Sequence, residues 1–201
     1  MPPSNRANVR TVANSEGAAL PSSERRLAHW KANPTAPTAN DTSPALLLAY
    51  AGLRSQEALQ LDWRHVNLRT RTLTIDRTKS GRARVVPMHP RVDAMLFGMW
   101  HAAGKPARGP VFLSARGRPY ADTRGLGGNP LKNAHKEACR RAGVTQFRLH
   151  DWRHDLAARF LIEGADVRSL MQIMGWSSPR MVQRYVTYRA EHLAAVLARV
   201  A

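Results

Sequence analysis

The stretch LHDWRHDLAARFLIEG, residues 149–164, has the spacing of an amphipathic helix. Its apolar side chains recur every third or fourth position, at Trp152, Leu156, Ala157, Phe160 and Leu161. Side chains at this spacing share one face of a helix, and in a globular protein such a face packs against a core. The stretch therefore predicts a helix over residues 150–163 with a buried stripe.

The first turn of this helix carries three cationic or titratable groups away from the stripe, namely His150, Arg153 and His154. A helix that only fills a core needs none of them. His150 and Arg153 are three residues apart and so share a face. This end of the helix is therefore expected to face an anionic group.

Outward from this helix, the pattern is mostly helical with one small hairpin. Further helices are expected over residues 44–54, 55–61, 89–103, 129–143, 166–175, 179–186 and 191–200. The β-rich runs 71–75 and 82–87 are joined by DRTKSGR, whose Lys-Ser-Gly turn predicts an antiparallel hairpin. The fold class expected is mainly α with a small antiparallel sheet (α+β).

The N-terminal part differs in composition from the rest. Residues 1–44 hold six of the 13 prolines and show little periodicity. We expect residues 1–20 to be a flexible arm and residues 21–201 to form the folded domain.

The charge indicates a polyanionic partner. Lys and Arg number 31 against 14 Asp and Glu, which gives a formal net charge of +17 and an isoelectric point near 11.5. Residues 45–201 carry 26 of the basic and 11 of the acidic residues, so the folded part is the basic part. Nucleic acid is the commonest partner of such a domain. A basic protein from a GC-rich genome is the alternative.

The number of cysteines and the hydropathy of the chain indicate the cellular compartment in which the protein is expected. Cys139 is the single cysteine, so neither a disulfide within the chain nor a cysteine-based zinc site is expected. No apolar run reaches the length of a membrane span, and the N-terminus lacks the apolar core of a signal peptide. We expect a cytoplasmic protein with no membrane partner.

Six polar or aromatic residues stand where ordinary packing does not require them: Arg54, Lys79, His150, Arg153, Trp176 and Tyr185. Each alone has a structural explanation. Together they supply the fixed positive charge, the acid and the nucleophile that attack on a phosphodiester requires. No acidic cluster of the kind that holds Mg²⁺ accompanies them, so neither a metal nor another cofactor is expected.

Four segments in order resemble the motifs of the tyrosine recombinases, the phage integrase family. They are YAGLRSQEALQLDWRHVNL (50–68), TKSGRARVVPM (78–88), LHDWRH (149–154) and MGWSSPRMVQRYV (174–186). The resemblance runs from about Ser22 to Tyr188. It implies the fold of the family's catalytic domain, without the separate N-terminal core-binding domain of full-length integrases.

The resemblance also implies roles for the site residues. Arg54 matches the first arginine, Glu57 the acidic residue that supports it, and Lys79 the hairpin lysine that protonates the leaving 5′-oxygen. In the His-x-x-Arg pair, His150 assists proton transfer and Arg153 clamps phosphate oxygens.

The last two positions of the pattern fall in the C-terminal motif. Trp176 stands where many members have histidine, and its indole N–H can donate to a phosphate oxygen but cannot carry a proton. Tyr185 matches the nucleophile and alone fits the Met-x-x-x-Tyr spacing, although a second phenol, Tyr188, follows. Thr187 stands where many members have histidine. His154 is expected to be a supporting residue.

The function implied is that of a site-specific DNA recombinase or integrase of a mobile element. It would cleave and rejoin DNA through a 3′-phosphotyrosyl intermediate, without metal or ATP. Two alternatives remain open: a weak or inactive DNA-binding remnant that modulates another integrase, and a type IB topoisomerase-like enzyme.

Further basic residues are expected to follow the DNA backbone, which contributes affinity without sequence information. They are Arg82, Arg84, Arg116, Arg118, Lys132, Lys136, Arg140 and Arg141. Double-stranded DNA is the expected partner, and no small-molecule substrate is expected. The helix at 191–200 has two open interpretations: the resemblance implies that it docks on a neighbouring protomer in a homo-oligomer on DNA, and the alternative is that it packs on the core of its own chain.

Overall fold

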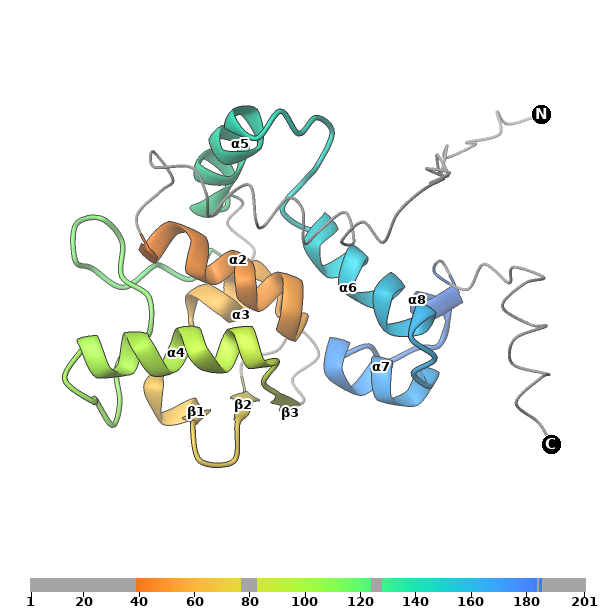
Figure 1. The fold of residues 1–201 in the computed structure, drawn as a ribbon, viewed down its shortest axis with the longest axis horizontal. Helices are drawn as coiled ribbons and strands as arrows, with labels where there is room; N and C mark the ends of the chain where they lie inside the picture. The colour runs from red at the N-terminus through yellow and green to blue at the C-terminus, as the bar shows by residue number, and fades with distance from the viewer. Residues whose placement is uncertain (1–38, 77–82, 124–127, 184, 186–201) are drawn as a thin grey trace.

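The computed structural model describes residues 39–76, 83–123, 128–183 and 185, and it is rich in helices (Figure 1). The helices are α2 (Ala39–Ala51), α3 (Ser55–Leu59), α4 (Pro90–Ala102), α5 (Leu131–Arg141), α6 (Asp151–Ile162), α7 (Val167–Met174) and α8 (Arg180–Gln183), with one 3-10 turn, η1 (Trp63–His65). The expected fold class is confirmed. The arm expected over residues 1–20 and the helix expected over 191–200 lie outside the described residues.

The sheet has three antiparallel strands in the order β1 (Val66–Asn67), β2 (Thr72–Ile75) and β3 (Arg84–Pro87). Strands β2 and β3 form the predicted hairpin, in a register that places Leu73 opposite Val86. Strand β1 was not expected, because two residues are too short to show an alternating pattern. Leu73, Ile75 and Val86 are buried, so one face of the sheet closes the core.

Helix α2 lies at the centre of the core, in contact with α3, α4 and α6 (Figure 1). Its residues 45–51 are all buried, as expected of a helix that is apolar on every side. The helix begins at Ala39, earlier than the expected start at Pro44. Proline suits a first turn, but here Pro44 lies inside the helix, where its missing N–H leaves one gap in the hydrogen-bond ladder.

Gly52 ends α2 and lets it approach α6 and α7 closely. Its φ of +64° is in the left-handed region, which glycine adopts without strain. A Cβ at this position would lie 2.7 Å from the Met174 sulfur and 3.2 Å from Leu156. The chain therefore turns toward α3 directly against a second apolar cluster, which α6, α7 and α8 build from Leu156, Ala157, Leu170, Met174 and Val182.

The stripe of α6 packs as predicted. Trp152, Leu156 and Ala157 are buried, and Phe160 and Leu161 pack partly buried against the second cluster. Helix α5, predicted over 129–143, is amphipathic, and Gly143 follows its end with a φ of +62°.

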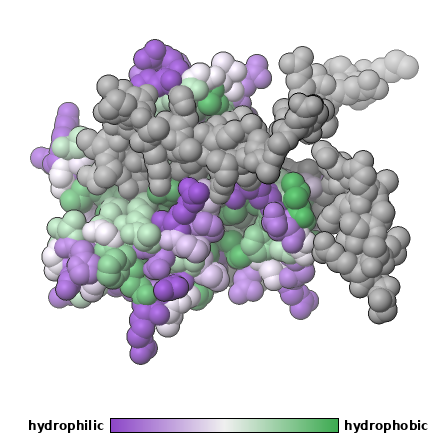
Figure 2. Space-filling model, viewed as in Figure 1, coloured by the Kyte–Doolittle hydropathy of each residue, from purple (hydrophilic) through white to green (hydrophobic). Residues whose placement is uncertain are grey.

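The surface is hydrophilic where α5 lies, at the top of the view in Figure 2. Within the part of the chain that the structure describes, no helix has both the length and the apolar character to cross a membrane.

Candidate active site

The site begins where α2 gives way to α3. The backbone N–H of Arg54 donates to the Glu57 carboxylate at 2.8 Å, and this carboxylate also accepts from Nη1 of Arg54 at 2.8 Å. An acidic side chain in the first turn that caps its own helix stabilises the start of that helix. Glu57 thus fixes both the backbone and the side chain of Arg54.

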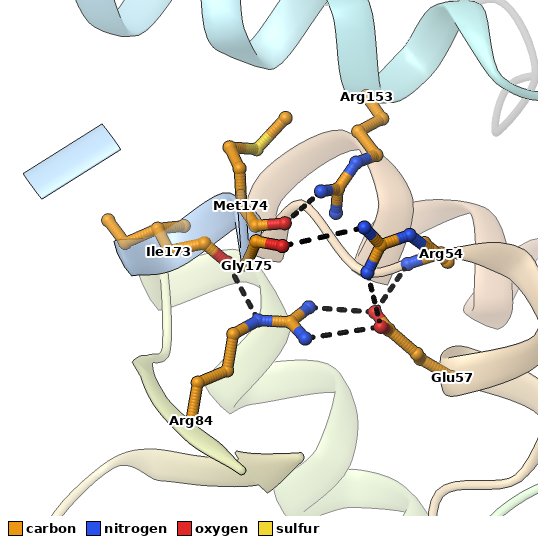
Figure 3. A network of polar contacts seen from close by, with 7 residues as sticks. All are labelled: Arg54, Glu57, Arg84, Arg153, Ile173, Met174 and Gly175. Atoms are coloured by element: carbon orange, nitrogen blue, oxygen red, sulfur yellow. Dashed lines mark hydrogen bonds and ion pairs between the residues drawn. The ribbon is translucent and has the colours of Figure 1, made fainter. Parts of the chain in front are cut away.

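Arg84 reaches the same carboxylate from β3 (Figure 3). Its Nη1 and Nη2 donate to the two Glu57 oxygens at 3.1 and 2.7 Å, and its Nε donates to the Ile173 carbonyl at 3.0 Å. The Arg84 side chain is only 6% exposed. Arg84 was expected to follow the DNA backbone, but in this structure its guanidinium is buried and occupied by Glu57. A planar guanidinium matches a carboxylate with two parallel bonds, and this pairing holds it inside.

Two arginines keep Glu57 ionised in the interior. Burial by itself would raise the pKa of Glu57, but the hydrogen bonds and charge of Arg84, with further hydrogen bonds from Arg54, outweigh it. The result is a pKa lowered from 4.5 to about 2. The carboxylate therefore remains charged at every physiological pH and compensates part of the positive charge around it.

Arg153 comes from α6 and is the most deeply buried of the three arginines, at 2% exposure. Its Nη2 donates to the Met174 carbonyl, whereas its Nη1 is buried and has no hydrogen-bond partner among the described residues. Burial, and next the charge of Arg54, lower the pKa of Arg153 to about 9. The guanidinium is thus still protonated at neutral pH, and its Nη1 amino group is unused.

The three guanidinium groups meet at the C-terminal end of α7 (Figure 3). Arg84 donates to the carbonyl of Ile173, Arg153 to that of Met174, and Arg54 to that of Gly175 at 3.5 Å. The last carbonyls of a helix have no partners within it and carry partial negative charge, so they attract cations.

Gly175 makes this convergence possible. It caps α7 with a φ of +59°, and a Cβ there would lie 3.0 Å from Nη1 of Arg84. Any larger residue would combine backbone strain with a clash against that guanidinium. The glycine therefore serves both the end of the helix and the approach of Arg84.

The aromatic part of the site lies beside Arg153. The Trp176 ring is 5.8 Å from the Arg153 guanidinium carbon and stacks on Tyr185 with 5.6 Å between ring centroids and 12° between planes. The Tyr185 hydroxyl hydrogen-bonds to Nδ1 of His154. The structure thus brings Tyr185, Trp176 and Arg153 into one cluster.

His150 lies just before α6 and is exposed. Its ring meets that of His154 edge-on, with centroids 4.7 Å apart at 86°. Burial of part of the ring, then the charges of His154 and Arg153, lower the pKa of His150 below its usual value near 6.5. His150 therefore gives up a proton more readily than a free imidazole.

Lys79 and Arg82 lie outside the described residues. Of the other basic residues, Arg116 and Arg118 are exposed in a turn, and Lys132, Lys136 and Arg140 are exposed on α5, where Arg140 pairs with Glu137. A cavity of about 900 Å³ is lined both by these three α5 residues and by His150, so α5 borders the same hollow as the residue that precedes α6. Within the described residues, no three His, Cys, Asp or Glu side chains are grouped to hold a metal ion.

The sequence model of the phage integrase family matches residues 24–192 of this chain. The chain belongs to the phage integrase family. It is 30% identical over 146 residues to the shufflon-specific DNA recombinase of Escherichia coli, a match that covers 72% of this chain and 34% of that protein. This family member spans about a third to a half of the length of the curated relatives it matches.

Two solved structures show the same fold. The XerA recombinase aligns with a TM-score of 0.68 at 22% identity, covering 89% of this chain and 63% of that one. The XerH site-specific recombinase, in a pre-cleavage complex with its difH substrate, aligns with a TM-score of 0.66 at 18% identity, covering 88% and 51%. The fold of a tyrosine recombinase catalytic domain is thereby confirmed for this integrase family member.

Sequence reasoning did not foresee two parts of the site. The pairing of Arg84 with Glu57 had one available signal, because Arg84 stands two residues before Val86 and so shares the buried face of the strand. The contact between His154 and Tyr185 had none, because it joins two elements whose relative placement the sequence does not give.

Proposed function

We propose that this chain provides the cleavage and rejoining centre of a site-specific DNA recombinase. One observation carries the proposal: a buried, protonated guanidinium, Arg153, keeps a donor without a partner beside the hydroxyl-bearing ring of Tyr185. A buried donor without a partner is costly unless a ligand completes it. A phosphate oxygen is the acceptor that a guanidinium fits best.

The chemistry then follows from the groups present. Arg54 and Arg153 hold the non-bridging oxygens of one phosphodiester and stabilise the charge that grows on them in the transition state. Tyr185 attacks phosphorus and forms a 3′-phosphotyrosyl bond, while the 5′-oxygen leaves. The covalent bond retains the energy of the broken linkage, so rejoining needs no ATP. By the family resemblance, Lys79 protonates the leaving oxygen.

Double-stranded DNA is the substrate that the relatives support. The similar Escherichia coli protein is a DNA recombinase by name, and the similar XerH structure is bound to a DNA substrate. The exposed lysines of α5 would follow the backbone beside the cleaved linkage. Residues 21–201 would form the catalytic domain after an arm at 1–20, and oligomers would assemble on DNA through the segment 191–200.

A suicide substrate tests the proposal without knowledge of the target site. A pool of nicked duplexes with a randomised centre is incubated with the protein in EDTA, and DNA that stays attached to protein in detergent is recovered. The nick lets the fragment with the free 5′-end diffuse away, which traps the adduct. We expect adducts from the wild type and from Tyr188→Phe, and none from Tyr185→Phe. Loss of the adduct in EDTA, or its persistence in Tyr185→Phe, would refute the proposal.

A further inference from the structure

We propose that His154 is the catalytic base of this site and takes the proton of the Tyr185 hydroxyl at its Nδ1 atom. The inference rests on the proposed function, because it assigns a role in the same cleavage step. The family resemblance places proton transfer on His150, so the structure assigns the attacking side of that transfer to a different imidazole.

Contact with the reacting atom distinguishes the two histidines. Nδ1 of His154 is hydrogen-bonded to the Tyr185 hydroxyl, the oxygen that would attack phosphorus. The rings of this pair lie 5.5 Å apart with 34° between their planes. His150 instead meets the ring of His154, which separates it from the phenol by one residue. A general base must lie within hydrogen-bond reach of the proton it removes, and His154 meets this condition.

The phenol is held for this transfer by its other neighbours. Trp176 stacks nearly parallel to the Tyr185 ring, and such stacking fixes the plane in which the hydroxyl moves. Trp176 is in turn placed over the guanidinium of Arg153. Because an indole cannot accept a proton at nitrogen, Trp176 orients the nucleophile but does not activate it.

The proposed step balances in atoms and charge. The O–H bond of Tyr185 breaks and its proton moves to Nδ1 of His154, while the oxygen forms a bond to phosphorus. The bond from phosphorus to the 5′-oxygen breaks, and that oxygen takes a proton from the acid, which the resemblance assigns to Lys79. In rejoining, the 5′-hydroxyl gives its proton back to the group that acted as the acid and its oxygen forms a bond to phosphorus. The bond from phosphorus to the Tyr185 oxygen breaks, and His154 returns its proton to that oxygen.

The positive charges near the pair favour removal of the proton from the Tyr185 hydroxyl. The charged and titratable groups near the pair include His150, Arg153 of α6 and Arg54 at the start of α3, and the carboxylates of Asp151 and Glu57 act on His150 and Arg153 with the opposite sign. Two fixed guanidinium groups stabilise a phenolate and the phosphate it attacks. Proton removal is therefore assisted at this position by groups that cannot themselves accept a proton.

The test compares single-turnover adduct formation in full-length variants between pH 6 and pH 9, with the trapped DNA sequence from the suicide pool as substrate. His154→Asn keeps a polar atom at the position of Nδ1 but cannot accept a proton. His150→Asn is the matched neighbour, and His101→Asn, an exposed histidine on α4, controls for substitution itself. Thermal unfolding of each variant checks that it folds.

We expect His154→Asn to slow adduct formation about 100-fold or more at neutral pH, the usual contribution of a general base. Its rate should then rise about tenfold per pH unit, because only hydroxide removes the proton. His150→Asn should lose activity yet keep the pH profile of the wild type, and His101→Asn should match the wild type. A rate and pH profile for His154→Asn equal to those of the wild type would overturn the inference while leaving the proposed function intact.

Two further measurements distinguish the loss of a catalytic base from a folding defect. In His154→Ala, added imidazole should restore adduct formation in a concentration-dependent way, and no restoration in a folded variant would count against the inference. A substrate with sulfur in place of the 5′-bridging oxygen needs no acid to leave. It should not rescue His154→Asn; rescue would assign His154 to the leaving-group side. If the wild type forms no adduct at Tyr185, the proposed function itself fails.

Discussion

At the scale of a single residue, Arg153 provides the buried positive charge of the site. It is buried, protonated and short of one hydrogen-bond acceptor, and it lies next to a second guanidinium, Arg54. A buried charge with an unpaired donor costs free energy of folding unless a partner compensates it, and here the partner would be the phosphate. Rigidly held donors of this kind act mainly on the transition state, where the phosphate carries additional charge.

Arg153→Lys should therefore reduce the rate of DNA cleavage far more than DNA affinity. A lysine keeps the charge but cannot donate to the Met174 carbonyl and a phosphate through one planar group. We expect cleavage to fall about 100-fold, while affinity for non-specific duplex changes by less than about threefold. Arg148→Lys, at an exposed arginine just before α6, is the control and should change neither. Equal losses in rate and affinity would make Arg153 an ordinary backbone contact.

At the scale of elements, Glu57 joins α3, β3 and α7 through Arg84. The carboxylate has a pKa of about 2 in the folded protein against an ordinary value of 4.5, so it contributes stability above pH 4.5 that is lost as the pH falls toward 2. The free energy of unfolding should decrease over this range by on the order of 3 kcal/mol from this group.

Urea unfolding at several pH values measures this contribution. Glu57→Gln should lower the free energy of unfolding at pH 7 by about 3 to 5 kcal/mol, because it leaves Arg84 buried without its counter-charge. The same variant should lose less stability than the wild type between pH 4.5 and pH 2. Parallel pH curves for the two proteins would show that Glu57 is not held as an ionised buried group.

A pair of glycines tests how α2 meets α6 and α7. Gly52→Ala combines a left-handed φ with a Cβ contact of 2.7 Å to Met174, so it should lower the free energy of unfolding by about 2 to 4 kcal/mol. Gly98→Ala places its Cβ in open space inside α4, where alanine is the better helix former, and should raise stability by about 0.5 to 1 kcal/mol. Thermal and urea unfolding check both, and equal effects of the two changes would contradict the packing described.

The elements themselves were largely predictable from the sequence, because their signals are local. The stripe of α6, the hairpin of β2 and β3 and the glycine stops at Gly52 and Gly143 each need only neighbouring residues. What the sequence could not supply was the pairing between distant side chains. Arg84 looked like one exposed cation among many, and only the packing of β3 against α7 places it on Glu57. The position of His154 on the Tyr185 hydroxyl depends in the same way on how α8 returns toward α6.

At the scale of the whole molecule, the net charge of +17 should make DNA binding strongly dependent on salt. Lys132 and Lys136 are exposed on α5 and line the hollow that also reaches His150. Changing either to alanine should weaken binding equally across sequences and reduce the slope of log affinity against log salt by about 0.9.

Lys105→Ala, beyond the end of α4, is the control. Titration of a labelled duplex at several salt concentrations measures the slope, and an effect of Lys105→Ala as large as those on α5 would contradict a DNA face along α5.

The central claim is that distant segments fold into one cationic site that delivers the Tyr185 hydroxyl to a DNA phosphate. Mass spectrometry of the trapped adduct tests it most directly. After nuclease and trypsin digestion, the peptide YVTYR, residues 185–189, contains both candidate tyrosines, and fragmentation separates them. The expected result is a deoxynucleotide 3′-phosphate on Tyr185 with Tyr188 unmodified. A nucleotide on Tyr188, or on any residue outside this peptide, would contradict it.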